Sequence, residues 1–227
     1  MRLPIALLAL LLLSAVRPAV AVGPESPAQA QPADEAPESM LAEPIEWRRS
    51  TAVGRTNAGR LLNGVQLPSE GEHFFTWDPI YDTTPNRPER RFATDRLVRV
   101  LLRALGEFRA ANPGAPRIGI GDLSRPRGGD FGRRYGAPGH ASHQNGLDAD
   151  VYYPRVDARE RGPADARQVD RALAQDLVDR FVRAGAKFVF VGLHVRLRGP
   201  RRIVQAIPNH DNHLHVRIPD NGKPAQR

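Results

Sequence analysis

The chain has 227 residues, a net charge of +8 and no cysteine. The lack of cysteine excludes disulfides, a cysteine nucleophile and a thiolate metal site, so any metal must be bound by His, Asp or Glu. A basic balance is typical of proteins that meet an anionic polymer, either a nucleic acid or a surface rich in carboxylate and phosphate.

Residues 1–21 have the features of a secretory signal peptide. Arg2 precedes about fourteen mostly apolar residues at 3–16, and Ala19 and Ala21 form a small-x-small cleavage signal. The apolar run is shorter than the roughly twenty residues that span a bilayer, although a short N-terminal anchor is the alternative. We therefore expect export to a periplasm, a cell wall or the medium, no stable membrane insertion after cleavage, and no nucleic acid partner.

Residues 22–47 are rich in proline and alanine and contain six acidic residues but no lysine or arginine. Such a segment buries little apolar surface and is predicted to be a disordered linker. Residues 48–227 remain as one domain with a net charge of +12, nearly all of it from arginine. This length suffices for a substantial core.

The first half of the domain predicts a helix over residues 93–111. Thr94 is its expected N-cap, and apolar residues recur with helical spacing along one face. A short strand is predicted at 117–121, followed by a glycine-rich functional loop at 124–139.

The second half predicts one further helix, over residues 165–184, with Gly185 at its C-terminal stop. Strands are predicted at 147–153, 187–191, 195–197, 203–206 and 213–218. These elements indicate an α+β fold, with a small, mostly antiparallel sheet and flanking helices.

Five of the seven histidines lie in two short segments, GHASHQNGLDAD at 139–150 and HDNHLHVRI at 210–218. Residues two apart in a strand share a face, so His213 and His215 project together and suit a metal, or a metal ligand beside a catalytic base. A pair of ordinary surface histidines is the alternative. His143 and Asp150 add two ordinary zinc ligands, and three ligands with one open position are typical of a catalytic zinc.

These two segments resemble the penicillin-insensitive murein endopeptidases, within the metallopeptidase group that includes lysostaphin-type enzymes, D-alanyl-D-alanine carboxypeptidases and the hedgehog domain. The resemblance covers roughly residues 50–218 and implies one catalytic Zn²⁺ on the sheet. The implied reaction is hydrolysis of D-alanyl–diaminopimelate crosslinks between peptidoglycan stem peptides, with related L,D bonds left open.

The resemblance also implies roles for single residues. It makes His143, Asp150 and His215 the zinc ligands and His213 the catalytic histidine. His140 and His210 match further site histidines, which are expected to contact substrate or support the ligands.

Arg125, in the loop before the first segment, is a candidate to bind a substrate carboxylate or the developing oxyanion. A solvated loop charge is the alternative. Asp148 is expected to support the site or to lie at the surface, and Asp211 to orient one of the clustered histidines. His73 and His194 are expected to be structural.

Two alternative functions remain open at this stage. One is a D,D- or L,D-carboxypeptidase or dipeptidase of the same metal group, which would only trim stem peptides. The other is a non-catalytic, zinc-dependent module that binds the wall.

Overall fold

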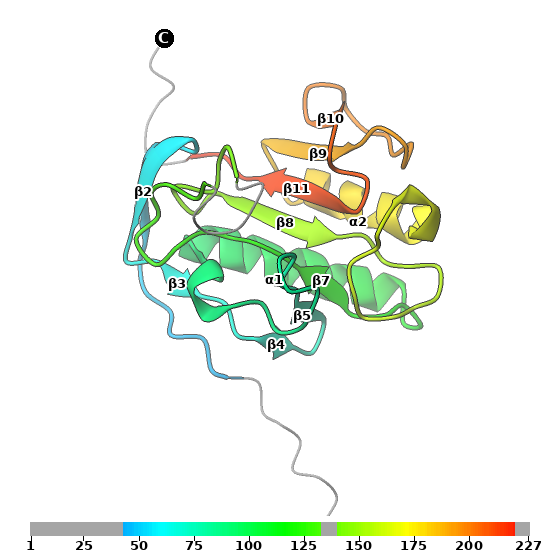
Figure 1. Cartoon of the computed structure of the whole chain (residues 1–227), viewed down its shortest axis with the longest axis horizontal. Coiled ribbons are helices and arrows are strands. Elements are labelled where there is room, and N and C mark those ends of the chain that lie inside the picture. The colour runs from blue at the N-terminus through cyan, green and yellow to red at the C-terminus, as the bar shows by residue number, and fades with distance from the viewer. Residues whose placement is uncertain (1–42, 133–139, 221–227) are drawn as a thin grey trace, which may run out of the picture. The chain divides into compact units, whose positions relative to one another are not determined.

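The computed structural model describes residues 43–132 and 140–220 (Figure 1). The predicted signal peptide, residues 22–42 of the predicted linker and residues 133–139 of the predicted loop lie outside the described residues. No helix within the described ranges has the length and apolar character needed to cross a membrane.

The described chain forms short strands, two α-helices and two short 3-10 helices. Their order is β1 (Thr51–Arg55), β2 (Ala58–Leu62), β3 (Val65–Gln66), β4 (Glu70–Gly71), β5 (Phe74–Thr76), η1 (Pro88–Arg90), β6 (Phe92–Ala93), α1 (Asp95–Ala111), β7 (Ile118–Ile120), β8 (Asp148–Tyr152), η3 (Ala166–Gln168), α2 (Arg171–Arg183), β9 (Phe188–Gly192), β10 (Val204–Ile207) and β11 (His213–Arg217).

The central sheet has seven strands in the order β10-β9-β11-β8-β7-β5-β4. The β10–β9 and β5–β7 pairs are parallel, and the other four neighbouring pairs are antiparallel. The predicted α+β class and the mostly antiparallel sheet are therefore confirmed. Two smaller two-stranded sheets, β1–β2 and β3–β6, lie outside it.

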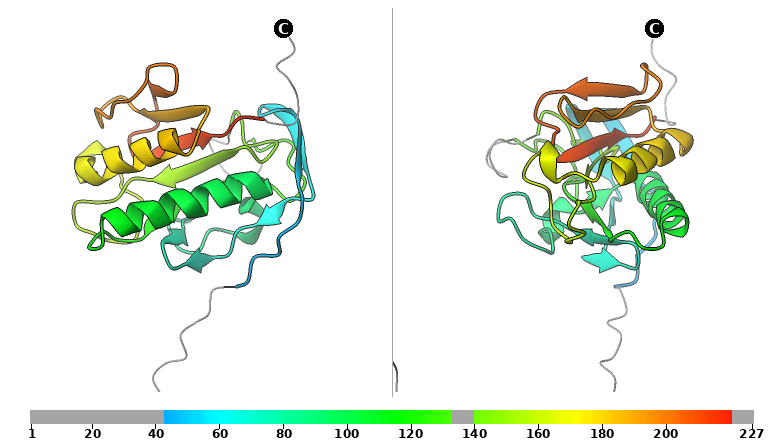
Figure 2. Two further views of the ribbon diagram at one scale, coloured as in Figure 1. Left: turned by 180° about the vertical axis from the view of Figure 1, so that it is seen from behind. Right: turned by 90° about the vertical axis from the view of Figure 1, so that its right-hand side faces the viewer.

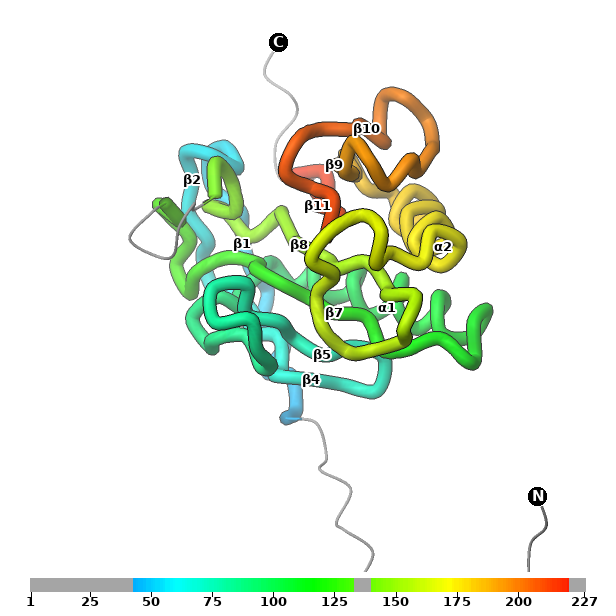
Figure 3. The backbone as a smooth tube through the Cα atoms, turned by 45° about the vertical axis from the view of Figure 1, so that its right-hand side comes forward, coloured from blue at the N-terminus to red at the C-terminus, as the bar shows by residue number. Residues whose placement is uncertain are grey.

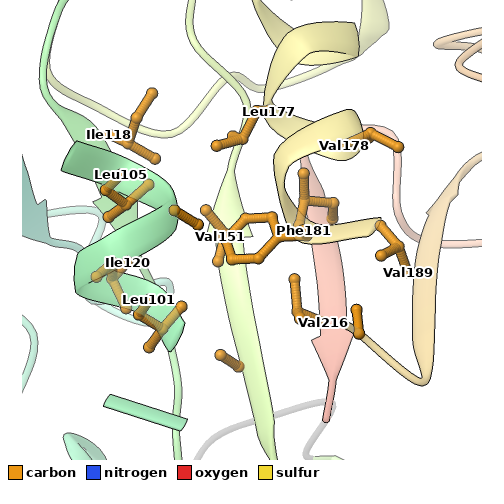
Figure 4. Packing of buried hydrophobic residues seen from close by; sticks show 14 of the residues in the cluster. Leu101, Leu105, Ile118, Ile120, Val151, Leu177, Val178, Phe181, Val189 and Val216 are labelled. Carbon is orange, nitrogen blue, oxygen red and sulfur yellow. The ribbon is translucent and has the colours of Figure 1, made fainter. Parts of the chain in front are cut away.

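Both helices cover the same face of the central sheet (Figure 2). Alternate residues of β8 and β11, including Val151 and Val216, point toward them and are buried with Leu101 of α1 and Phe181 of α2 (Figure 4). Residues on the opposite side of the same strands are polar. One face of the sheet therefore builds the core, which leaves the other face available for a site.

The hairpin of β1 and β2 lies beside the loop that follows β7 (Figure 3). The amide of Leu61 donates to the carbonyl of Arg127 at 2.9 Å, and Arg60 forms an isolated bridge with Gly128. Further along, the amide of Gln144 donates to the carbonyl of Thr56 at 2.9 Å. The hairpin therefore contacts both the first histidine segment, through Gln144, and the loop that precedes this segment, through Arg127 and Gly128.

The first helix ends at Ala111 as predicted and begins at Asp95, two residues after its predicted start, because Ala93 belongs to β6. Thr94 is the N-cap, and its hydroxyl accepts from the amide of Leu97 at 3.3 Å. The second helix begins later than predicted, at Arg171. Asp165 caps the separate short turn η3, and Asp170 then caps α2 by accepting from two backbone amides. Asp165 and Asp170 are both good N-caps and lie only five residues apart. The sequence alone therefore does not show whether one long helix starts at the first cap or a short turn precedes a helix that starts at the second.

The strand predicted at 195–197 does not form, and that prediction was wrong. Arg196 has a left-handed φ of 58°, which breaks an extended strand. The backbone of Arg198 bonds the side chain of Gln175 twice, at 2.9 Å each, so side-chain partners replace a strand ladder there. The strands predicted at 117–121, 147–153, 187–191, 203–206 and 213–218 are present to within one or two residues.

Phe181 offers a direct test of this core. Its side chain is fully buried between α2 and the sheet, so Phe181→Ala should lower the free energy of unfolding by about 3–5 kcal/mol. Leu193, which is half exposed, is the matched control, and Leu193→Ala should change stability by less than about 0.5 kcal/mol. Urea denaturation of both variants measures this, and equal small losses would contradict the described packing.

Candidate metal centre and active site

Strand register brings the polar residues of the open sheet face together. β8 and β11 pair antiparallel, with Asp150 opposite His215 and Asp148 opposite Arg217. His213 pairs with Tyr152 one step further along the same two strands. Because these residues alternate with core residues, their side chains share the face that the helices leave uncovered.

His143 reaches this face from the loop that precedes β8. It adopts a left-handed φ of 68°, and Gly146 after it has a φ of 74°; the turn returns the chain to the sheet. The ring is fully buried, and its Nδ1 lies 2.5 Å from the carbonyl oxygen of Leu123. A carbonyl only accepts, so Nδ1 carries the proton and the Nε2 lone pair points at Asp150 Oδ1, 3.3 Å away.

His215 is oriented in the same way by a carboxylate. Its Nε2 donates to Asp148 Oδ1 at 2.7 Å, which leaves the Nδ1 lone pair 3.4 Å from Asp150 Oδ1. Asp148 is fully buried and also accepts from Nε of Arg217 at 2.6 Å. Asp148 therefore fixes the orientation of the His215 ring, which agrees with the expectation that it supports the site.

When both rings are neutral, the lone pairs of His143 Nε2 and His215 Nδ1 therefore both face Asp150 Oδ1. His143 Nε2 and Asp150 Oδ1 are both buried and have no hydrogen-bond partner among the described residues. Facing lone pairs repel unless a proton or a cation lies between them. Ligand atoms of His140, His143 and Asp150 lie within 4.8 Å of one another and could hold a metal ion. The donors present therefore fit a metal with nitrogen and oxygen ligands.

The electrostatics of the protein alone agree with this fit. Burial opposes a charge on Asp150, but the surrounding imidazoles, His143 first, hold its pKa well below the usual range. Burial likewise opposes protonation of His143, yet Asp150 outweighs it and raises the pKa of His143 to about 9. One positive charge is therefore favoured beside Asp150, and a bound cation would supply it.

His213 differs from these two histidines in its surroundings. Desolvation and neighbouring imidazoles lower its pKa to about 4, against the opposing effect of Asp150. Its Nδ1 lies 2.7 Å from the side-chain oxygen of Asn212, and its Nε2 lies 3.7 Å from Asp150 Oδ1. His213 therefore stands neutral at the edge of the centre, with a lone pair turned inward.

A cavity of about 800 Å³ opens over the centre. Asp150, His213 and His215 line it from the sheet, together with His140 and His210 from the loops. Four of the five predicted site histidines therefore share one cavity, whereas His143 is fully buried and is not among the described residues that line it. The remaining wall of the cavity comes from the β1–β2 hairpin, the loop after β5, and the segment between β10 and β11.

His210 lies at the exposed rim of this cavity. Its ring centroid is 4.8 Å from that of His213, and its Nδ1 lies 2.7 Å from the carbonyl oxygen of Pro208. The second ring nitrogen of His210 is therefore an acceptor, placed where an entering molecule would pass.

Arg125 is not among the described residues that line the cavity. Its guanidinium donates to the backbone carbonyl of Asp130 at 3.0 Å. Arg90 and Arg217 line the cavity instead. Arg90 precedes α1 and is distant in sequence from both histidine segments. Arg217 lies within the second segment, and strand alternation places it on the same face as His213 and His215, so that pattern could have identified it.

Asp211 binds a different histidine from the one expected. Its carboxylate accepts from both the backbone amide and the ring Nδ1 of His194, at 2.9 and 2.5 Å. Asp211 thus fixes the start of the loop after β9 and orients none of the histidines in the cavity by a described contact. His73 lies in the turn between β4 and β5, next to α1, and is not among the described residues that line the cavity.

Asp148 provides a test of how the ligands are oriented. His215 and Arg217 both donate to Oδ1 of Asp148. Asp148→Asn replaces this charged acceptor with a neutral amide oxygen, which makes weaker hydrogen bonds, so His215 should be held less firmly in one tautomer. Metal affinity should fall by about 10- to 100-fold. Zinc titration against a chromogenic chelator measures this. Asp165→Asn, at an exposed turn cap, is the control, and equal affinities in both variants would contradict the role of Asp148.

The chain is similar to a known group of enzymes. A family model described as penicillin-insensitive murein endopeptidase matches residues 52–184. A protein of that name from Haemophilus influenzae is 29% identical over 125 residues, covering 50% of this chain and 39% of the relative. One of the same name from Escherichia coli O157:H7 is 29% identical over 150 residues, covering 63% of this chain and 47% of the relative. The chain thus spans less than half the length of these relatives.

Proposed function

Because the chain belongs to the penicillin-insensitive murein endopeptidase family, we propose that its domain is a zinc-dependent peptidase that cuts peptide crosslinks in bacterial peptidoglycan. The observation that carries this proposal is the buried, unpartnered pair of His143 Nε2 and Asp150 Oδ1 beneath an open cavity. Such a pair has little value for folding, since a buried ion pair seldom stabilises a protein more than apolar residues of the same volume. It has a clear value for holding a cation.

The proposed ligands are His143, Asp150 and His215. Two imidazoles and one carboxylate are the ligand types of catalytic zinc sites, and the lone pairs of both rings are fixed by hydrogen bonds on their opposite nitrogens. Zinc bound there would polarise the scissile carbonyl and make hydroxide available at neutral pH.

His213 is the proposed catalytic histidine. It lines the cavity, keeps an acceptor nitrogen toward the centre, and is partly exposed, whereas His143 is fully buried. No glutamate is among the described residues that line the cavity, so a histidine is the better candidate to move a proton during attack on the peptide carbonyl.

The proposed substrate is the D-alanyl–diaminopimelate crosslink, with L,D bonds as a second class. Arg217 supports a substrate rich in carboxylates, because only its Nε is committed to Asp148 in a described hydrogen bond and its side chain lines the cavity. The positive charge of the domain supports the same polymer. Export by the N-terminal segment and an acidic linker before the domain complete the proposal.

Digestion of purified, crosslinked peptidoglycan by residues 22–227 tests this function. Muropeptides are analysed by mass spectrometry after reaction of the native, chelator-treated and zinc-restored protein. We expect crosslinked dimers to become intact monomers, chelation to stop the reaction, and zinc to restore it.

Other product patterns would replace the proposal. Stem peptides that lose only terminal residues would indicate a carboxypeptidase of the same metal group. A protein that binds zinc and sediments with the wall but cuts nothing would indicate a binding module. Activity that persists without metal would refute the proposed zinc dependence.

A further inference from the structure

A buried network outside the proposed ligand set surrounds Asp122, which lies two residues after the end of β7. Its carboxylate is fully buried and lies 2.7 Å from Nε2 of His140. Arg90 donates to both carboxylate oxygens, through Nε at 2.6 Å and through Nη2. The side-chain amide of Asn86 donates to Oδ1 at 3.0 Å. The carboxylate therefore has donors on every side.

Burying this ion pair removes two charged groups from water, and the resulting desolvation penalty makes the network a poor source of folding stability. Arg90 is 3% exposed and Asp122 is 0% exposed. Buried ion pairs seldom stabilise a protein more than apolar residues of the same volume. The network also reaches the active site, because Asp122 and Arg90 both line the cavity and the imidazole that the Asp122 carboxylate contacts there is that of His140.

The ring of His140 is fixed by this carboxylate and by stacking. Phe131 stacks on it with ring centroids 5.0 Å apart, and the ring of His143 packs against it at a tilt, with centroids 4.3 Å apart. Since a carboxylate only accepts, Nε2 of His140 carries the proton. In the neutral ring, Nδ1 then presents its lone pair toward Asp150, whose Oδ2 is 3.7 Å away.

The two sides of the network are also rigidly connected. The backbone amide of Asp150 donates to the carbonyl of Asp122 at 2.9 Å, and the amide of Gly121 donates to the carbonyl of Asp150 at 2.8 Å. Asp122 and Asp150 therefore keep a constant separation, and any ring held by the first has a defined position relative to the second.

We propose that Asp122 is a positioning residue that holds His140 in one tautomer, with its Nδ1 as an additional acceptor inside the active-site cavity. His140 thereby contacts the substrate or its attacking water, while Asp122 acts only through His140. Arg90 and Asn86 keep the carboxylate in place. This inference deepens the proposed function and rests on it for its kinetic consequences, but the tautomer itself does not depend on any activity.

Asp122→Asn separates positioning from a merely structural role. Arg90 can only donate and should claim the amide oxygen of the new side chain, so the amide NH₂ should turn toward His140. The ring would then take the opposite tautomer, with its proton on Nδ1 and its lone pair turned away from the cavity. A similar carboxylate-to-amide change beside a catalytic histidine costs about 10⁴-fold in serine proteases through the same loss of tautomer.

The first readout is the tautomer of His140, measured by ¹⁵N NMR of histidine-labelled, metal-free protein at neutral pH. We expect a proton on Nε2 in the native protein and on Nδ1 in Asp122→Asn. Asp78→Asn is the matched control, since Asp78 is buried and paired with Arg87 through a 2.6 Å bond. It should lower the melting temperature but leave the His140 tautomer unchanged. A native His140 protonated on Nδ1, or an unchanged tautomer in Asp122→Asn, would overturn the proposal.

The second readout is kinetic coupling on peptidoglycan. Asp122→Asn and His140→Ala should each lower kcat at least tenfold with little change in KM, and the double variant should lose no more than His140→Ala alone. Multiplying losses would indicate that Asp122 acts independently of His140 and would overturn the proposal. A native protein that shows the expected tautomer but cuts nothing would refute the proposed function, while the positioning of His140 would stand.

Discussion

Asp150→Asn should abolish both metal binding and hydrolysis while leaving the metal-free protein at least as stable as the native one. Asp150 is the group on which the lone pairs of His143 and His215 converge, at 3.3 and 3.4 Å. Replacing Oδ1 by an amide NH₂ would let a neutral His143 Nε2 accept a hydrogen bond in place of the buried ion pair of the metal-free protein, and such a replacement seldom destabilises a fold. A cation at that point would lose its only charged ligand of the proposed set.

The measurement is the melting temperature of native and variant protein with and without zinc. A ligand at 1,000 times its dissociation constant stabilises a protein by about 4 kcal/mol, so the native melting temperature should rise markedly. The Asn variant should show no rise, and its activity should fall by about 10³-fold or more. A zinc-dependent rise of native size in Asp150→Asn would contradict the assignment of Asp150 as a ligand.

His213→Ala should stop turnover while leaving most of the zinc bound. His213 lies beside the proposed ligands rather than among them, with Nε2 3.7 Å from Asp150 Oδ1 and its other nitrogen bonded to the neutral side chain of Asn212. Loss of a positioned proton-transfer group lowers rates by about 10²- to 10⁴-fold. Because His143, Asp150 and His215 remain, the metal should remain too.

Metal analysis after dialysis against zinc, together with peptidoglycan digestion, measures both effects in one preparation. His215→Ala is the control, since it removes a proposed ligand from the same strand, two residues away. It should lose zinc and activity together. Equal loss of zinc from the two variants would falsify the division of roles between them.

The sequence predicted those parts of the structure that depend on local patterns. Thr94 as a cap and the apolar face of α1 follow from helical spacing, and both are observed. The common face of His213 and His215 follows from strand alternation, and both residues line the cavity. Segments whose backbone groups form hydrogen bonds with side chains were less predictable. The turn around Arg196 is an example, because the neighbouring backbone of Arg198 bonds the side chain of Gln175.

Pairings between distant segments could not be predicted from the pattern of a single sequence. The register that sets His215 opposite Asp150 depends on which strands of the sheet are neighbours. The contact between Asp122 and His140 depends on the loop after β7 returning over the strand that follows. Arg125 was a reasonable candidate by proximity in sequence, whereas Arg217 lines the cavity because strand alternation places it beside His215.

Anomalous diffraction at the zinc absorption edge, from crystals of zinc-loaded residues 22–227, tests the central claim most directly. The account predicts one strong peak within about 2.0–2.2 Å of His143 Nε2, a carboxylate oxygen of Asp150 and His215 Nδ1, with His213 outside bonding distance. No peak in the cavity, or a peak whose ligands exclude Asp150, would contradict it.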